Sequence, residues 1–182
     1  MRRGQTGLTL LEAIFALALV FLLIGAIFLV YLSLLQGWDQ IGRRDDLREK
    51  LQFGLERVIR DVRHANAISV ANHALRFTAN ESGSDASYIY YLYNSSDVWP
   101  PNYNQASYDL RRVSLSGGLN GTFTYGSGDL ILTALRPPNN TTITTTDPYT
   151  GLSCTHCAVI ALAAQSSTET LNVRGYVRPR NI

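Results

Sequence analysis

The first half of this chain contains no proline, since the first of its six prolines is Pro100. Charge is also missing from one long stretch, because residues 13–35 include no Asp, Glu, Lys or Arg. Proline disrupts helix interiors because it lacks a backbone N–H, so nothing of this kind interrupts a helix before Pro100. A helix of about 20 apolar residues crosses the hydrocarbon core of a bilayer. The two absences therefore predict one long N-terminal helix with a membrane-spanning part.

Sequence signatures of catalysis and of metal binding are missing as well. The chain has no glycine-rich phosphate loop, no His-Glu-x-x-His and no Gly-x-Ser-x-Gly. A calcium site built on Asp147 and residues 144–146 would offer a single carboxylate, whereas Ca²⁺ prefers several. A Ser, His and Asp brought together only by folding stays open. We expect no catalytic residue, no metal site and no cofactor, and hence a protein that is not an enzyme.

The net charge is small. Sixteen basic and fourteen acidic side chains give +2, and without Arg2 and Arg3 the basic count falls to fourteen, equal to the acidic count. A balanced charge does not favour nucleic-acid binding. Arginines that precede an apolar run stay on the cytoplasmic side, so most of the chain is expected outside the cytoplasm.

Cysteine is scarce. The only two are Cys154 and Cys157, in Cys-Thr-His-Cys. In an oxidising compartment such a pair forms a disulfide, which here would close a short loop with a modest gain in stability. Three alternatives stay open: labile thiols, a metal site that recruits His156, and a redox site, although no βαβ pattern surrounds the motif.

A carboxylate lies at the entrance of the apolar run, in Gly7-Leu8-Thr9-Leu10-Leu11-Glu12. A lone carboxylate in hydrocarbon costs roughly 2.5–3.5 kcal/mol on insertion scales. With the basic residues before it, this segment resembles the N-terminus of type IV prepilins. In that family a short basic leader ends in Gly and precedes Phe-Thr-Leu-x-Glu and an apolar helix. Leu8 stands where the family usually has Phe.

The resemblance implies a set of site residues. A membrane prepilin peptidase would cut between Gly7 and Leu8, and Leu8 would then be N-methylated. Glu12 would pair with the α-amino group of a neighbouring subunit in a filament. Two other interpretations stay open: a secretory signal peptide, whose apolar core is shorter at about 7–15 residues, and a plain single-pass anchor with Glu12 at the membrane interface.

Beyond Gly37 the pattern becomes amphipathic. Acid-to-base pairs at i,i+4 support an exposed face, as in Asp46 with Lys50 and Glu56 with Arg60. We expect one helix from about residue 8 to about residue 67, with its second half packed on a sheet. The apolar stripe that recurs at steps of three and four consists of Leu47, Leu51, Leu55, Val58, Val62 and Ala65, and the first five of these are expected to be buried under the sheet.

After residue 67 the composition favours strands. A hairpin of 68–71 and 75–79 turns at Asn72-His73, and a second hairpin is expected from 122–125 and 130–135 around Gly126 and Gly128. Further strands are expected at 88–93, 107–115, 158–164 and 170–177, with a loop at 137–152.

An aromatic set accompanies these strands and has two interpretations. It either packs in the core or forms a recognition surface together with Arg111 and Arg112. The set consists of Tyr88, Tyr90, Tyr91, Tyr93, Trp99, Tyr103 and Tyr108.

Short motifs in the second part also resemble one branch of the family, the J-type pseudopilins and PilW-like minor pilins. These motifs are Asp61-Val62-Arg63, Tyr90–Tyr93 followed by Leu110-Arg111-Arg112, and Pro179-Arg180-Asn181. The expected fold is therefore α+β and type IV pilin-like: a long N-terminal helix, transmembrane in its hydrophobic half, packed by its amphipathic half on an antiparallel β-sheet.

The expected organisation is a leader at 1–7, a transmembrane or filament-core helix at 8–35 and an extracytoplasmic domain at 36–182. Within that domain we expect amphipathic helix at 36–67 and sheet at 68–182. The protein is expected in the inner (cytoplasmic) membrane, with its domain in the periplasm or outside the cell, and in an assembled filament.

The expected function is that of a minor pilin or pseudopilin, a structural subunit that primes or caps a type IV pilus-like filament in a secretion, pilus or DNA-uptake machine. Its partners would be the prepilin peptidase, the major and other minor pilins or pseudopilins, and the cytoplasmic membrane. Nucleic acid would be a partner only in a DNA-uptake system. The competing interpretation is a single-pass membrane-anchored extracytoplasmic binding domain or enzyme.

Overall fold

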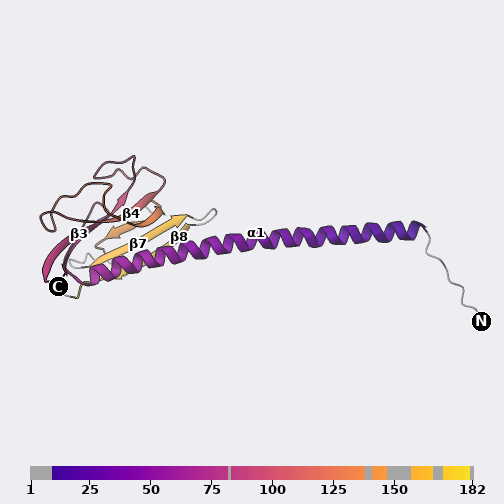
Figure 1. The fold of residues 1–182 in the computed structure, drawn as a ribbon, viewed down its shortest axis with the longest axis horizontal. Coiled ribbons are helices and arrows are strands. Elements are labelled where there is room, and N and C mark those ends of the chain that lie inside the picture. Colours follow the sequence, from indigo (N-terminus) through magenta and orange to yellow (C-terminus); the bar gives the residue numbers. More distant parts are fainter. Residues whose placement is uncertain (1–9, 82, 138–140, 147–156, 166–169, 181–182) are drawn as a thin grey trace, which may run out of the picture. The chain divides into compact units, whose positions relative to one another are not determined.

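A computed structural model describes residues 10–81, 83–137, 141–146, 157–165 and 170–180 (Figure 1). Contacts divide the chain into two compact units, Met1–Arg44 and Asp45–Ile182. The elements in chain order are α1 (Leu10–Arg63), β1 (Ala65–Ala71), β2 (Ala74–Glu81), β3 (Ser84–Tyr93), β4 (Tyr108–Ser114), β5 (Asp129–Leu135), β6 (Thr142–Thr144), β7 (Ala158–Gln165) and β8 (Thr170–Val177).

Within the first unit, residues 13–35 of α1 carry no charge and are apolar on all sides. The large side chains of this unit are exposed, as in Leu10 at 82% and Leu22 at 71%. Among the described residues, α1 is the one helix that is long enough and apolar enough to cross a membrane. No part of its most apolar stretch is buried by the rest of the protein. A helix with this surface needs lipid or neighbouring helices around it.

The part of α1 that belongs to the second unit buries one stripe. Leu51, Leu55, Val58 and Val62 are all at most 5% exposed, and Leu47 packs against them half-buried. Intervening residues such as Phe53 stay exposed. The predicted amphipathic packing of this helix on an antiparallel sheet is therefore confirmed.

The helix ends earlier than its sequence suggests. We expected helix to residue 67 and sheet from residue 68, but α1 ends at Arg63 and β1 begins at Ala65. His64 N donates to the Asp61 carbonyl, a tightened last turn, and the carbonyl of Arg63 accepts from Arg180 N at 3.2 Å. The helix thus ends because β1 pairs with β2 and the C-terminal segment bonds to the last turn, although the sequence at this point contains no local stop signal.

The sheet is antiparallel, in the order β1-β2-β3-β4-β5-β7-β6, and β8 pairs with β7. The first hairpin turns at Asn72 and His73, as predicted. The strands expected at 88–93, 107–115, 158–164 and 170–177 are confirmed as β3, β4, β7 and β8 within a few residues. In Figure 1, β7 and β8 lie along the end of α1 that packs on the sheet.

The second predicted hairpin is wrong. Residues 122–125 form no strand: Thr122 makes only an isolated bridge with Ser116. Instead β5 pairs with β4, with Leu110 opposite Leu132. Gly128 makes this approach feasible, because a Cβ there would lie 2.2 Å from the Arg112 carbonyl oxygen.

A further strand was missed. β6 lies inside the segment expected as a loop at 137–152, and it pairs with β7 through Ile143, which is 3% exposed. Its three residues, Thr142-Ile143-Thr144, are β-branched and alternate polar with apolar, but a single apolar residue among threonines is too short a signal to identify a strand.

The sheet carries apolar residues on both faces. The face toward α1 holds a core that includes Phe77, Tyr90, Leu92 and Leu110. The opposite face holds a smaller cluster of Ala74, Ile89, Tyr91 and Leu115, covered by Trp99, Phe123 and Tyr125. Successive residues of β3 alternate between the two, as the pleat of a strand requires.

Candidate functional site

The first candidate site is the start of α1. Glu12 lies in the first turn of the helix and is exposed. A negative charge there is favoured by the helix dipole. Gly7 and Leu8, the expected cleavage and methylation residues, lie outside the described residues. This part of the chain therefore presents an acidic group followed by an uninterrupted apolar surface.

A second group of polar side chains joins the end of α1 to the sheet. Asp61 accepts a 2.6 Å hydrogen bond from the hydroxyl of Tyr90 and lies 3.2 Å from Nε of Arg112. The Arg112 guanidinium lies over the Tyr88 ring, 3.9 Å from its centre. Burial, and then the hydrogen bond to Asp61, raise the pKa of Tyr90 far above its ordinary value. The phenol therefore stays protonated and holds the helix on β3.

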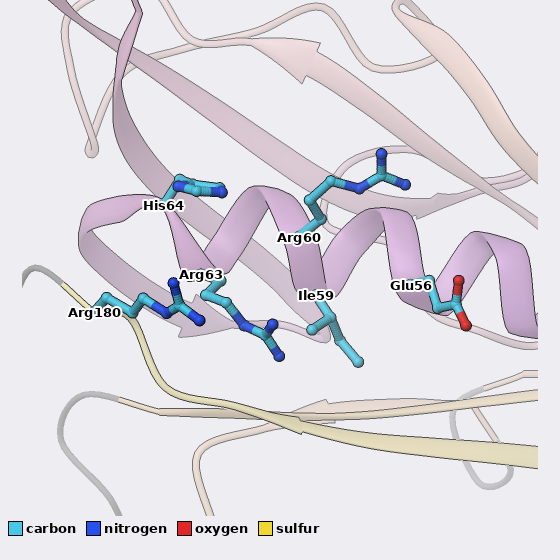
Figure 2. A pocket seen from close by; sticks show the side chains of 6 residues that line it. All are labelled: Glu56, Ile59, Arg60, Arg63, His64 and Arg180. Carbon is cyan, nitrogen blue, oxygen red and sulfur yellow. The ribbon is translucent and has the colours of Figure 1, made fainter.

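A basic cavity of about 410 Å³ lies at the C-terminal end of α1 (Figure 2). Figure 2 shows Arg63 and Arg180 on one side of the helix end, with Arg60 and His64 on the other. Glu56 is its acidic lining residue. Positive side chains are favoured at a helix C-terminus by the dipole, so helix stability accounts for these arginines without a ligand.

A second cavity, of about 540 Å³, differs from the first because none of its described lining residues is Asp, Glu, Lys or Arg. Its walls come from the turn between β1 and β2, from residues 100–103 and from residues 143–146. His73 and Tyr103 meet edge to face there, with ring centres 5.3 Å apart. The described part of its surface thus consists of uncharged polar groups, rings and apolar side chains.

The aromatic set mostly packs rather than presenting a surface. Tyr90, Tyr91 and Tyr108 are at most 1% exposed. The hydroxyl of Tyr91 donates to the Ser127 carbonyl and accepts from Gly126 N. These two bonds hold the loop that precedes β5 over the smaller apolar cluster of the sheet. The packing interpretation is therefore confirmed for these tyrosines.

Arg111 serves the same loop. Its Nη1 donates to the Gly126 carbonyl at 2.7 Å, and its guanidinium lies 4.5 Å from the centre of the Tyr93 ring. Arg111 and Arg112 are both partly buried against their own sheet. Each guanidinium thus packs on a partly buried tyrosine of the sheet, which does not favour the interpretation as an exposed recognition surface.

Of the two cysteines predicted to form a disulfide, the structure describes only Cys157. Cys157 is fully buried and disulfide-bonded. Cys154 lies outside the described residues, as do His156 and Asp147, so the pairing with Cys154 stays a prediction. Among the residues that the structure does describe, no cluster of three His, Cys, Asp or Glu side chains could hold a metal ion.

The polar contacts between the end of α1 and the rest of the domain were not predicted from sequence, although a signal for them existed. The three short motifs near residues 61–63, 110–112 and 179–181 were singled out only for their resemblance to a family. In the structure Asp61 pairs with Arg112, and Arg63 bonds to Arg180. The motifs therefore meet around the end of one helix.

No family model, curated protein or solved structure matches this chain.

Proposed function

We propose that this chain is a minor pilin or pseudopilin, a structural subunit of a type IV pilus-like filament. The observation that carries the proposal is the two-part surface of α1. One part exposes apolar side chains on all sides behind an acidic first turn, and the other is buried on the chain's own sheet.

This arrangement suits a subunit that exchanges one apolar environment for another. The exposed part is stable in lipid and equally stable among apolar helices of other subunits, so transfer between them costs little. The buried part keeps the domain attached to the helix during that transfer. Subunits that meet head to tail without closing a ring form a filament.

Glu12 has a defined role in this proposal. Its carboxylate contributes to assembly by pairing with the α-amino group of Leu8 in a neighbouring subunit, after cleavage behind Gly7. Charge pairing inside an apolar bundle is strong because the surroundings screen it weakly. The domain then lies outside the cytoplasm and the chain waits for assembly in the cytoplasmic membrane.

The first test is mass spectrometry of the N-terminus in the membrane fraction. We expect a chain that begins at Leu8 with a methylated amine. Gly7→Val should block removal of the leader, whereas Gly4→Val, a glycine of the same leader, should not. An intact Met1 in the wild-type chain would sink the assembly proposal.

The second test separates assembly from anchoring. Glu12→Gln should insert and be processed normally but fail to enter sheared filaments, whereas Glu12→Asp, which keeps the charge, should retain part of the incorporation. Wild-type incorporation of Glu12→Gln would favour the competing function, a binding domain on a plain membrane anchor.

A further inference from the structure

Trp38 lies where the uncharged part of α1 gives way to a charged part. Residues 13–35 carry no charge. Asp39 follows Trp38 directly, and Arg43 lies about one turn further on. The Trp38 side chain is 76% exposed, so the protein itself does not cover it. Because the span before it suits a bilayer by length and composition, lipid is the surrounding that its position offers.

Tryptophan suits one level of a bilayer better than any other. Its ring is large and apolar, whereas its indole N–H is a hydrogen-bond donor. In hydrocarbon the donor would lack a partner, and in water the ring would stay hydrated. Among the lipid head groups both needs are met, and Trp and Tyr are enriched at that level. Trp38 is the only tryptophan of α1, since the other one in the chain is Trp99.

The length of α1 fits this level at both ends of the span. Glu12 and Trp38 are 26 positions apart in one helix. At about 1.5 Å per residue they are about 39 Å apart, or about 37 Å along the membrane normal at a tilt of about 20°. The hydrocarbon core is about 30 Å thick, and about 40–45 Å with the head-group regions. A helix with Trp38 among the head groups on one side therefore carries Glu12 among those on the other.

We propose that Trp38 anchors α1 in a lipid bilayer, with its indole among the lipid head groups at the C-terminal end of the span. Glu12 then lies in the head-group region at the opposite end, where its carboxylate stays hydrated. If the helix moves along the membrane normal, one direction takes the carboxylate into hydrocarbon and the other takes the indole N–H there. Both movements are unfavourable, so the two residues hold the depth of α1 from both ends.

This inference goes beyond the filament role. It needs α1 to cross a bilayer, but it needs neither cleavage behind Gly7 nor assembly. An intact Met1 would sink the filament proposal and leave the depth of Trp38 unaffected. The two proposals can therefore fail separately.

The test measures tryptophan fluorescence of the full chain in phosphatidylcholine vesicles. The lipids carry a nitroxide quencher either on the head group or at the end of an acyl chain. Trp99→Phe leaves Trp38 as the sole tryptophan, and we expect the head-group quencher to reduce its emission about twofold more than the chain-end quencher. Stronger quenching from the chain end would place the indole in hydrocarbon, and quenching by neither would place it in water or under protein. Either result would overturn the proposal.

Tyr31 provides a matched control position. It is 55% exposed and lies two turns before Trp38, on the same side of the helix. In a chain with Tyr31→Trp, Trp38→Tyr and Trp99→Phe, the fluorophore should lie about 10 Å deeper, and the order of the two quenchers should reverse. Equal depths for the fluorophores at positions 31 and 38 would contradict the proposed placement of the helix.

The same control chain tests the anchoring itself. Tyrosine at position 38 keeps an amphipathic ring, whereas Trp38→Leu in its place lengthens the apolar run. We expect the fluorophore at position 31 to move toward the bilayer centre with Trp38→Leu, and an unchanged depth would overturn the anchoring role.

Trp99 packs against Tyr91 and Phe123, so Trp99→Phe could disturb the fold. In that case the difference in quenching between the unaltered chain and Trp38→Phe isolates the emission of Trp38. The same order of the two quenchers is expected for this difference, and the reverse order would overturn the proposal.

Discussion

The two parts of α1 obey the same local rules and have opposite surroundings. Leu22 is 71% exposed in the first part, whereas Val58 is 1% exposed in the second. Both parts are helical because their residues form helices well and no proline interrupts them. The difference is that the second part alternates apolar with charged residues and finds a sheet within its own chain. Residues 13–35 of the first part have no polar face and must obtain their partners elsewhere.

The largest expected effect separates the buried stripe from its exposed neighbours. Leu55→Asp places a charge at a position 5% exposed under the sheet, so it should lower the free energy of unfolding by several kcal/mol, of order 3–5. Phe53→Asp, two residues away and 63% exposed, should change it by about 0.5 kcal/mol or less. Near-ultraviolet circular dichroism melts of the full chain in detergent measure both.

Equal tolerance of the two substitutions would contradict the packing of α1 on the sheet. The amphipathic part would then meet other subunits instead, and the contrast between the two parts of the helix would disappear.

The next effect concerns pH. Burial, and then the hydrogen bond and charge of Asp97, raise the pKa of Tyr108 to about 12 from its ordinary value near 10. Because the pKa of Tyr108 is higher in the folded protein than in the unfolded one, the contribution of Tyr108 to the free energy of unfolding is complete below pH 10. This contribution is lost as pH rises toward 12. The free energy of unfolding should therefore fall steadily between these two pH values.

This loss should affect only the packed domain. On alkaline titration we expect the tertiary signal to fall above pH 10 while helicity of the apolar part persists in detergent. Tyr108→Phe should reduce the pH dependence without abolishing it, because the raised pKa of Tyr90 adds to the loss in the same range. Tyr176→Phe, at a 46% exposed position, should leave the pH dependence unchanged. A pH dependence that Tyr108→Phe leaves unaltered would show that another group is responsible.

The disulfide should contribute less. Replacing Cys154 and Cys157 with Ser should cost about 2 kcal/mol, because the loop that the bond closes is short. The loss should be confined to the region before β7, where hydrogen exchange would report it. Thiol labelling of both cysteines without reductant would refute the pairing.

The smallest effect compares two glycines of α1. A Cβ on Gly54 would lie 2.3 Å from Leu132 Cδ1, whereas nothing lies within 4 Å of one on Gly42. Overpacking costs about 1–3 kcal/mol and better helix propensity returns up to about 1, so Gly54→Ala should destabilise by about 1 kcal/mol. Gly42→Ala should cause no loss. Equal melting temperatures for the two variants would mean that β5 yields freely at this contact.

Sequence patterns predicted those structural features that depend only on residues close together along the chain. The apolar run, the stripe from Leu47 to Val62, the Asn72-His73 turn and the aromatic strand β3 were all recognisable, because each has a repeat or a turn signal of its own. The stop of α1 at Arg63, the strand β6 and the pairing of β5 with β4 were not. Each depends on a partner far along the chain, such as Arg180, β7 or Arg112.

Some candidate sites were likewise recognisable from the sequence, and others were not. Glu12 was visible at once, because a carboxylate beside a long uncharged run stands out in any reading of the sequence. The contact of Asp61 with Arg112 and the cavity beside His73 were not, because their members are separated by tens of residues and share no spacing.

The sequence by itself determined that a long apolar helix precedes a β-rich domain, since helix length, polarity and strand alternation are local properties of the chain. The tertiary structure alone shows which strands cover the apolar stripe of α1, where the helix ends, and that His73 and Tyr103 share a cavity. The physical reason is that burial and hydrogen-bond satisfaction are properties of groups that meet in space, and the order of residues along the chain does not state which groups will meet.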